Sequence, residues 1–202
     1  ITGGDSVCLN SPQPQIIITG SGGTAPYTIT YSINTVVQPT IVSSGNTVII
    51  NASTNTEGTF DYELISIEES SSANCNQLVT GSTTVIVNDA PIINTPTPYE
   101  VCDDNNDGKS CLFVLTTKNN EISTDPTVVI TYHETPTDAQ TGANPVSTTT
   151  YCSIDNSGFQ TLFVRAYFTG TPACFSTTTL QLIVNPRPFA NPTITDYALC
   201  DY

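Results

Sequence analysis

Short segments in which apolar and polar residues alternate recur along almost the whole chain, and they limit its fold more than any other feature. A period of two places successive side chains on opposite faces of an extended strand, as in a half-buried β-strand. Gly, Ser and Asn separate the segments, as at 20–23 and 44–46, and mark turns. The expected strands are 15–19, 27–33, 47–51, 60–67 and 79–88 in the first half, and 112–116, 128–132, 160–168 and 177–185 in the second.

Closely spaced short strands with such turns, in a chain rich in Val, Ile and Thr, predict an all-β protein made of tandem immunoglobulin-like β-sandwich domains. Helical periodicity is nearly absent, and only 117–122 and 137–141 are expected to form single helical turns. Most of the aromatic residues that alternate within the strands are expected in the core, namely Tyr27, Tyr31, Phe60, Tyr62, Phe163 and Tyr167.

The two halves of the chain end in the same way, which predicts two equivalent domains. Cys75 and Cys174 each precede a Thr-rich final strand, and a linker containing Pro follows each strand. Cys200 and its surroundings resemble the region of Cys102, so a third unit begins near the end of the sequence, and the repeat is about 100 residues long. The expected domains are two sandwich repeats at 1–90 and 91–187, and a linker with the start of a third repeat at 188–202.

The seven cysteines predict a disulfide framework and an oxidising compartment. Cys8 and Cys75 flank the strands of the first domain, and Cys102 and Cys174 flank those of the second, so we expect the bridges Cys8–Cys75 and Cys102–Cys174. Cys111 and Cys152 then pair by elimination. Cys200 is expected to pair with a residue beyond this sequence, and the rival interpretation is a free catalytic thiol.

The charge of the chain excludes some partners. Four Lys and Arg residues stand against 18 Asp and Glu residues, for a net charge of -14, and 1–90 contain no Lys or Arg. Nucleic acid and anionic membrane surfaces both require basic patches, so neither is expected as a partner. No run of apolar residues is long enough to span a bilayer, and no leader is recognisable at the start, so we expect the targeting signals to lie outside this sequence.

Asp103, Asn105 and Asp107 alternate before Gly108 and present oxygen ligands in the pattern of a calcium loop. Val114, however, stands where such a loop has a bidentate Glu. Calcium binding at these three residues is therefore expected to be weak, with help from Glu100, Glu121 or Asp104. The alternative is an Asx-rich turn without a metal.

No catalytic residues are expected. His133, the single histidine, ends an expected strand, has no nucleophile near it in the sequence, and is expected at the surface. Glu68 and Glu69 are adjacent and would point to opposite faces of a strand, which does not suit paired acid catalysis. Trp, the usual platform for stacking sugars, is absent.

Three motifs resemble repeats of giant cell-surface adhesins of Bacteroidetes: GGTAPY from Gly22, CDDNNDG from Cys102, and TYHETPTDAQTG from Thr131. The resemblance implies export by the type IX secretion system, attachment at the outer membrane surface, and a role in gliding motility or adhesion. It implies no catalytic residues.

Two functions follow as hypotheses. The first is a non-catalytic stalk segment of an adhesin, whose partners are an external surface or polysaccharide and other repeats of the same chain. The second is a carbohydrate- or ligand-binding accessory module of a secreted multidomain enzyme.

Overall fold

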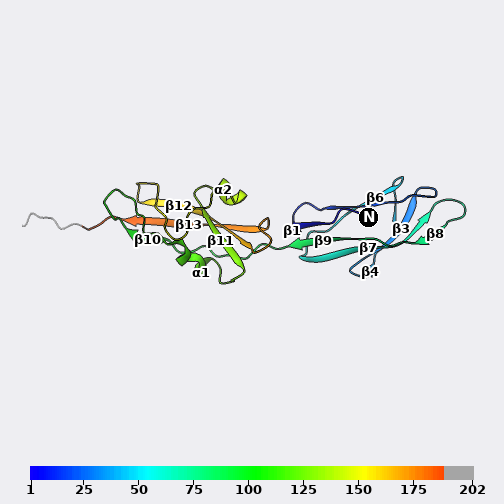
Figure 1. Cartoon of the computed structure of the whole chain (residues 1–202), viewed down its shortest axis with the longest axis horizontal. Coiled ribbons are helices and arrows are strands. Elements are labelled where there is room, and N and C mark those ends of the chain that lie inside the picture. Colours follow the sequence, from blue (N-terminus) through cyan, green and yellow to red (C-terminus); the bar gives the residue numbers. More distant parts are fainter. Residues whose placement is uncertain (189–202) are drawn as a thin grey trace, which may run out of the picture. The chain divides into compact units, whose positions relative to one another are not determined.

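The computed structural model describes residues 1–188, which are built mainly of β-strands (Figure 1). The all-β class predicted from the sequence is confirmed. Contacts divide the chain into two compact units. The first comprises Ile1–Pro91 together with Tyr167–Phe175, and the second begins with Ile92–Ala166 and resumes at Ser176. The proposed start of a third repeat lies outside the described residues, except for Pro188.

The first unit contains one large and one small sheet. In the large sheet the strand order is β1-β9-β7-β3-β4, with β5 on β3 and β8 on β7, and the small sheet pairs β2 with β6. The strands are β1 (Asp5–Cys8), β2 (Gln15–Thr19), β3 (Tyr27–Ile33), β4 (Val36–Val37), β5 (Ile41–Val42), β6 (Thr47–Asn51), β7 (Gly58–Glu69), β8 (Asn76–Leu78) and β9 (Ser82–Asn88).

Alternating side chains bring the two sheets of the first unit together. In β2, Ile16 and Ile18 are buried, whereas Ile17 between them is 37% exposed. Ile16 joins Tyr62 and Val85 of the large sheet in one apolar cluster, and Ile18 joins Tyr27 in another. The first unit is therefore a β-sandwich whose core lies between its sheets.

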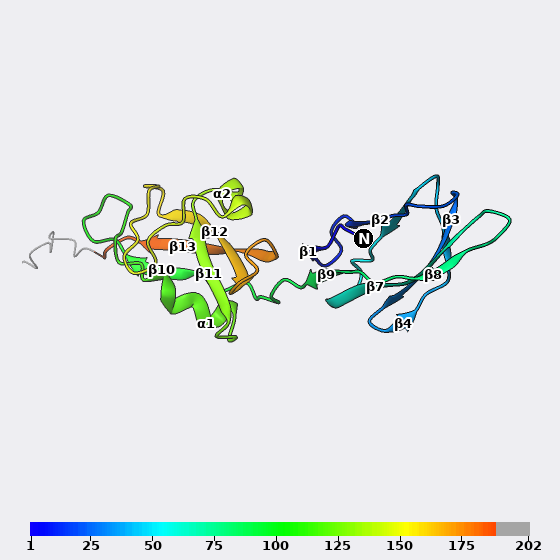
Figure 2. The same cartoon turned by 45° about the vertical axis from the view of Figure 1, so that its right-hand side comes forward.

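The second unit has one sheet with the order β10-β13-β12-β11 (Figure 2). Two short helical segments follow β10, and a third follows β11. Thr135 caps this third helix by accepting a hydrogen bond from Asp138 N, and Gly142 ends it with a positive φ of 73°. The elements are β10 (Tyr99–Cys102), the 3₁₀ helix η1 (Leu115–Lys118), α1 (Asn119–Ile122), β11 (Val128–His133), α2 (Pro136–Thr141), β12 (Phe159–Phe168) and β13 (Phe175–Asn185).

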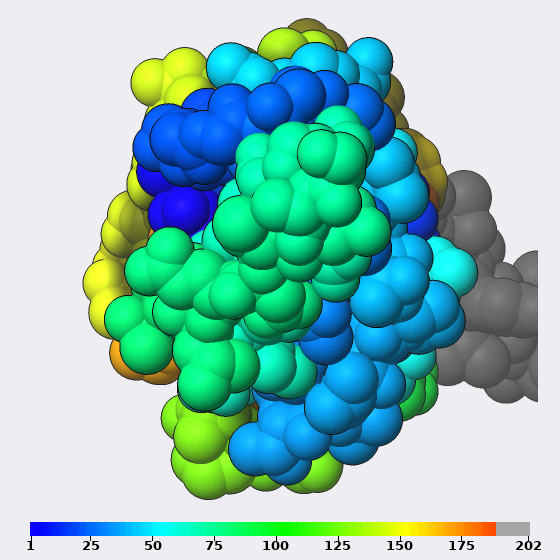
Figure 3. All heavy atoms as spheres, turned by 90° about the vertical axis from the view of Figure 1, so that its right-hand side faces the viewer, coloured from blue at the N-terminus to red at the C-terminus, as the bar shows by residue number. Residues whose placement is uncertain are grey.

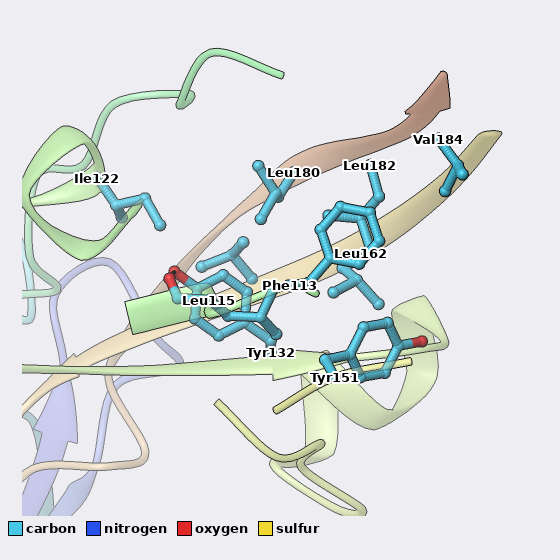
Figure 4. Close-up of a cluster of buried hydrophobic side chains, with 10 residues drawn as sticks. Phe113, Leu115, Ile122, Tyr132, Tyr151, Leu162, Leu180, Leu182 and Val184 are labelled. Atoms are coloured by element: carbon cyan, nitrogen blue, oxygen red, sulfur yellow. Dashed lines mark hydrogen bonds between the residues drawn. The ribbon is translucent and has the colours of Figure 1, made fainter. Parts of the chain in front are cut away.

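The short helical segments η1 and α1, together with irregular chain, cover the inner face of this sheet and complete the core. Phe113, Leu115 and Ile122 pack from this layer against Leu162 of β12 and Leu182 of β13 (Figure 4). All five are 0% exposed. Phe113 and Tyr151 form an isolated antiparallel bridge within the covering layer. This layer is therefore held by side-chain burial more than by a ladder of backbone hydrogen bonds.

The first and last strands of each unit pair in parallel. In the first unit β1 lies beside the end of β9, with Cys8 opposite Asn88. In the second unit β10 lies beside the end of β13, with Cys102 opposite Asn185. Neither first strand was expected from the sequence, because only four residues of each carry the pattern.

Two expected strands differ in the structure. The expected strand 112–116 is wrong, because only Phe113 finds a strand partner and Leu115 already begins η1. The alternation there reflects burial of Phe113 and Leu115 in the core. The expected strand 79–88 begins later, at Ser82, because Gly81 adopts a φ of 156° and separates β8 from β9. No helix among the described residues has the length and apolarity needed to cross a membrane.

Candidate functional site: the disulfides and the Asp103 loop

The Cys111–Cys152 disulfide predicted from the sequence is confirmed. It lies beside the Phe113–Tyr151 bridge, where Tyr151 N donates a hydrogen bond to Phe113 O at 3.0 Å. On the other side of the disulfide, Ser153 N donates to Ser110 O at 3.0 Å. The bond thus joins two neighbouring segments of the layer that covers the sheet. Loop-closure entropy for its sequence separation of 41 corresponds to about 4 kcal/mol.

The other expected bridges are wrong. Cys8 is bonded to Cys174, with their Cα atoms 5.4 Å apart. Cys75 and Cys102 are free and exposed. Cys174 directly precedes β13 and belongs to Tyr167–Phe175, the segment that groups with the first unit. The Cys8–Cys174 bond therefore lies within the first compact unit, although β12 and β13 continue into the second.

Strand register explains why Cys8 does not pair with Cys75. Cys8 lies opposite Asn88, next to Val87, and Val87 lies opposite Gly58 at the start of β7. Cys75 O accepts a hydrogen bond from Glu69 N at the end of β7. The 12 residues of β7 span about 35 to 40 Å, whereas the Cα atoms of a disulfide lie within about 7 Å of each other.

The same geometry separates Cys102 from Cys174. Cys102 lies opposite Asn185 at the end of β13, and Cys174 precedes the first residue of that strand. The 11 residues of β13 again span about 35 Å. In both cases, therefore, the two cysteines that were expected to pair stand at opposite ends of a long strand.

Asp103 organises the loop for which calcium was predicted. Its side chain is only 4% exposed. Its Oδ1 accepts hydrogen bonds from Asn105 N at 3.0 Å and Asn106 N at 2.7 Å, and its Oδ2 accepts one from Gly108 N at 2.8 Å. Burial opposes ionisation, but these backbone donors together outweigh it and lower the pKa of Asp103.

The other predicted ligands take part in the same turn. Asn105 Oδ1 accepts from Asp107 N at 3.1 Å, and Asp107 Oδ1 accepts from Lys109 N at 2.8 Å. Asp107 Oδ2 also accepts from Asn105 Nδ2 at 3.1 Å. Gly108 has a φ of 80°, and a Cβ there would lie 2.2 Å from Asn156 O, so only glycine fits. These contacts are those of an Asx-rich turn.

Of the three additional ligands suggested by the sequence, Asp104 lies beside the predicted ligands, whereas Glu100 and Glu121 have other partners. Carboxylate oxygens of Asp103, Asp104 and Asp107 lie within 4.8 Å of one another. Glu121 instead forms an ion pair of 2.7 Å with Lys118, which with Thr97 lowers its pKa to about 2. Glu100 accepts a hydrogen bond from Asn185 Nδ2 at 3.0 Å. Calcium binding by Asp103, Asn105 and Asp107 stays a prediction, and the metal-free turn stays its alternative.

His133 lies in the interior, and its expected place at the surface is wrong. The side chain is 0% exposed. Its Nδ1 lies 2.7 Å from Ala143 O, and its Nε2 lies 2.9 Å from Thr131 Oγ1. A carbonyl oxygen can only accept, so Nδ1 carries the proton in this pair. The imidazole thereby holds the segment after α2 against β11.

Glu69 has a structural role that the sequence did not show. Its Oε2 accepts a hydrogen bond from Thr24 N at 2.7 Å, and its Oε1 accepts one from Ser71 Oγ at 2.5 Å. The Ser71 hydroxyl first, and the Thr24 amide second, lower the pKa of Glu69. The carboxylate therefore fixes the turn that carries Cys75. The signal that could have found this role is the run of Ser residues directly after Glu69.

Comparisons with known proteins bear on the second half of the chain. Residues 98–188 match a family described as the Flavobacterium inter-domain disulphide bond domain. No curated protein matches the sequence. The two disulfides are of a kind that persists in oxidising compartments, and with the β-sandwich fold they indicate a secreted or surface module.

Several solved structures are similar over most of the chain. The fibronectin(III)-like modules of Clostridium thermocellum CbhA are 10% identical, with a TM-score of 0.40, over 99% of this chain and 96% of theirs. The Sidekick-1 immunoglobulin domains are 12% identical, with a TM-score of 0.34, over 95% of this chain and 47% of theirs. The human mucin-like protocadherin is 17% identical, with a TM-score of 0.29, over 92% of this chain and 96% of its own.

Proposed function

We propose that the chain is a non-catalytic segment of a large secreted bacterial surface adhesin, in which units of this kind serve as stalk repeats in gliding motility or attachment. The observation that carries the proposal is the Cys8–Cys174 disulfide, which joins residues separated by 166 positions. Loop-closure entropy for this separation corresponds to about 5 kcal/mol. A covalent loop of this size is valuable to a structure that bears load outside the cell, where unfolded chain is exposed to proteases.

The surface of the chain suits such a stalk. The excess of 18 acidic over four basic residues keeps copies of the chain apart in solution. The proposed partners are an external surface or polysaccharide and other repeats of the same protein. The proposed location is the outer face of the outer membrane, reached by type IX secretion as the resemblance to Bacteroidetes adhesins implies.

The proposal is tested in cells that produce the protein. An antibody raised against this chain should label intact cells, and attachment under flow should fall several-fold when the residues of this chain are removed in frame. Replacing both Cys8 and Cys174 by Ser provides the matched variant, because it removes the covalent loop and leaves the length unchanged. This variant should attach normally in still medium and detach earlier as shear increases.

An accessory module of an enzyme would give different results. The purified chain would then bind a soluble polysaccharide, and cells lacking these residues would attach normally while degrading that polysaccharide more slowly. That pair of results would overturn the stalk proposal.

A further inference from the structure

Strand β8 lies at an edge of the large sheet in the first unit, and among the described strands it pairs with β7 alone. Cys75 O accepts a hydrogen bond from β7 and Val79 N donates one to it, each at 3.1 Å. In an antiparallel pair, residues whose backbone groups face the neighbouring strand alternate with residues whose groups face away. The N–H and C=O groups of Asn76 and Leu78 therefore face away from β7, along an edge that no described strand covers.

The β8 edge carries neither charge nor proline. Both features protect sheet edges, because charges repel a second strand and proline lacks the N–H that would pair with it. Residues 70–88 contain no Asp, Glu, Lys, Arg or Pro, although the whole chain has a net charge of -14. At the opposite edge of the same sheet, Pro39 stands between β4 and β5. The β8 edge is therefore able to accept another strand.

The side chains around β8 also leave a place for a further strand. All three residues of β8 are exposed, and Leu78 is 80% exposed. Two cavities of about 410 and about 290 Å³ share Gln77 and Ile67 in their walls, and the smaller one reaches the core residues Ile18 and Ile29. Figure 3 shows the segment that carries β8, coloured green, at the centre of one face. The sandwich is thus hollow beside this edge, where the next strand of the sheet would lie.

The charge of the chain indicates which strand fits this edge. The surface holds 18 Asp and Glu residues against four Lys and Arg residues, so a basic partner would bind away from the uncharged β8 edge. The strand that fits is itself uncharged and free of proline. Strand β8 of a second copy meets both conditions, and its own outward backbone groups also lack a strand partner.

We propose that two copies of the chain pair through their β8 strands, antiparallel and about a two-fold axis at Gln77. Asn76 of each copy then lies opposite Leu78 of the other, and each such pair exchanges both of its backbone hydrogen bonds. The contact is isologous, since the same residues serve on both sides. The two Leu78 side chains become diagonal neighbours and cover each other, while Gln77 of each copy extends the cavity wall of the other. The proposal goes beyond the stalk function, because it concerns contacts of the isolated chain.

The pairing acts against the repulsion between two acidic chains. Salt screens this repulsion, because the Debye length falls from about 30 Å at about 0.01 M to about 8 Å at about 0.15 M ionic strength. The association should therefore strengthen as salt is added over this range. Chains held side by side on one surface also meet at a high local concentration, which favours the pair.

Sedimentation of the purified chain at increasing concentration measures the association, with Cys75, Cys102 and Cys200 replaced by Ser so that no disulfide links the copies. Leu78→Asp places additional carboxylates beside each other in the contact. Val36→Asp is the matched control, because Val36 is 64% exposed on β4 at the opposite edge and the change in charge is the same. We expect Leu78→Asp to weaken the association by about tenfold or more and Val36→Asp to change it by less than about twofold, with equal melting temperatures.

Amide hydrogen exchange, measured residue by residue, reports on the same edge. In dilute protein the amides of Asn76 and Leu78 should exchange faster than that of Gln77, whose backbone faces β7. At concentrations that favour the pair, exchange at Asn76 and Leu78 should slow several-fold, whereas exchange at Gln77 should change little.

Four results would overturn the proposal. They are equal weakening by the two Asp variants, association that is stronger at low salt, fast exchange at Asn76 and Leu78 in the associated protein, and a chain that stays monomeric at every concentration. Each is a property of the purified chain and not of cell attachment, so it is distinguishable from a failure of the stalk proposal.

Discussion

The carboxylate of Asp103 accepts backbone hydrogen bonds from Asn105, Asn106 and Gly108, so the order of this loop depends on the ionisation of one side chain. Its pKa is lower in the folded protein than in the unfolded chain. The stabilisation is therefore present above the unfolded pKa, near 3.9, and is lost as the pH falls through the folded pKa. We expect Asp103→Asn to lower the melting temperature at pH 7 and the difference from wild type to shrink at strongly acidic pH. Thermal melts across pH would check this, and a constant difference would contradict it.

Replacement of Asp107 distinguishes between calcium binding and a metal-free Asx turn in the same loop. If calcium binds the folded form alone, it stabilises that form by about 2.7 kcal/mol at a hundredfold excess over the dissociation constant. The sequence-based prediction is a higher melting temperature in millimolar calcium than in sodium of equal ionic strength. Asp107→Ala should remove the calcium-specific part, since it removes a ligand and leaves Gly108 to make the turn. Equal responses of wild type and variant to calcium would show that the loop is an Asx turn without a bound metal.

At the scale of elements, the Cys111–Cys152 disulfide holds a layer that has few backbone hydrogen bonds of its own. Replacing both cysteines by Ser should lower the free energy of unfolding by about 2 to 4 kcal/mol, because the unfolded chain gains the entropy of an open loop. Denaturant unfolding measures the change. Cys75→Ser is the control, since Cys75 is exposed and free and its replacement should change stability little. Equal stability of the double variant and wild type would show that burial of Phe113 and Tyr151 is enough to hold this layer without the disulfide.

Most strands that alternate over five or more residues were predictable, with 112–116 as the exception, and contacts that depend on register were not. The bounds of β2, β3 and β6 agree with those expected, because each presents one buried face to the core. The parallel pairing of β1 with β9 has no local signal, and without it Cys8 and Cys75 appear adjacent. The buried place of His133 was missed for a similar reason, since its partner Ala143 comes from beyond α2.

At the scale of the whole molecule, the two disulfides give the chain a covalent connectivity that differs from the order of its sequence. Cys8 stands near the beginning of the described residues, and Cys174 stands near their end. The expected bridges within each repeat would have produced two separate small loops. The observed bond produces one large loop, and Cys111–Cys152 lies entirely inside it.

This connectivity determines how the chain carries tension. A pull on its two ends passes from β1 through the Cys8–Cys174 sulfurs to β13, so once the sheets have unfolded the residues between the two cysteines bear no tension. In single-molecule pulling, the oxidised chain should therefore extend only by the residues outside the loop. Reduction should add the contour of 166 residues, about 560 Å at about 3.4 Å each. An equal extension with and without reductant would show that tension follows the peptide backbone. The bond thus makes the protein a tether whose greatest length is set by a pair of sulfur atoms and not by the stability of its sheets.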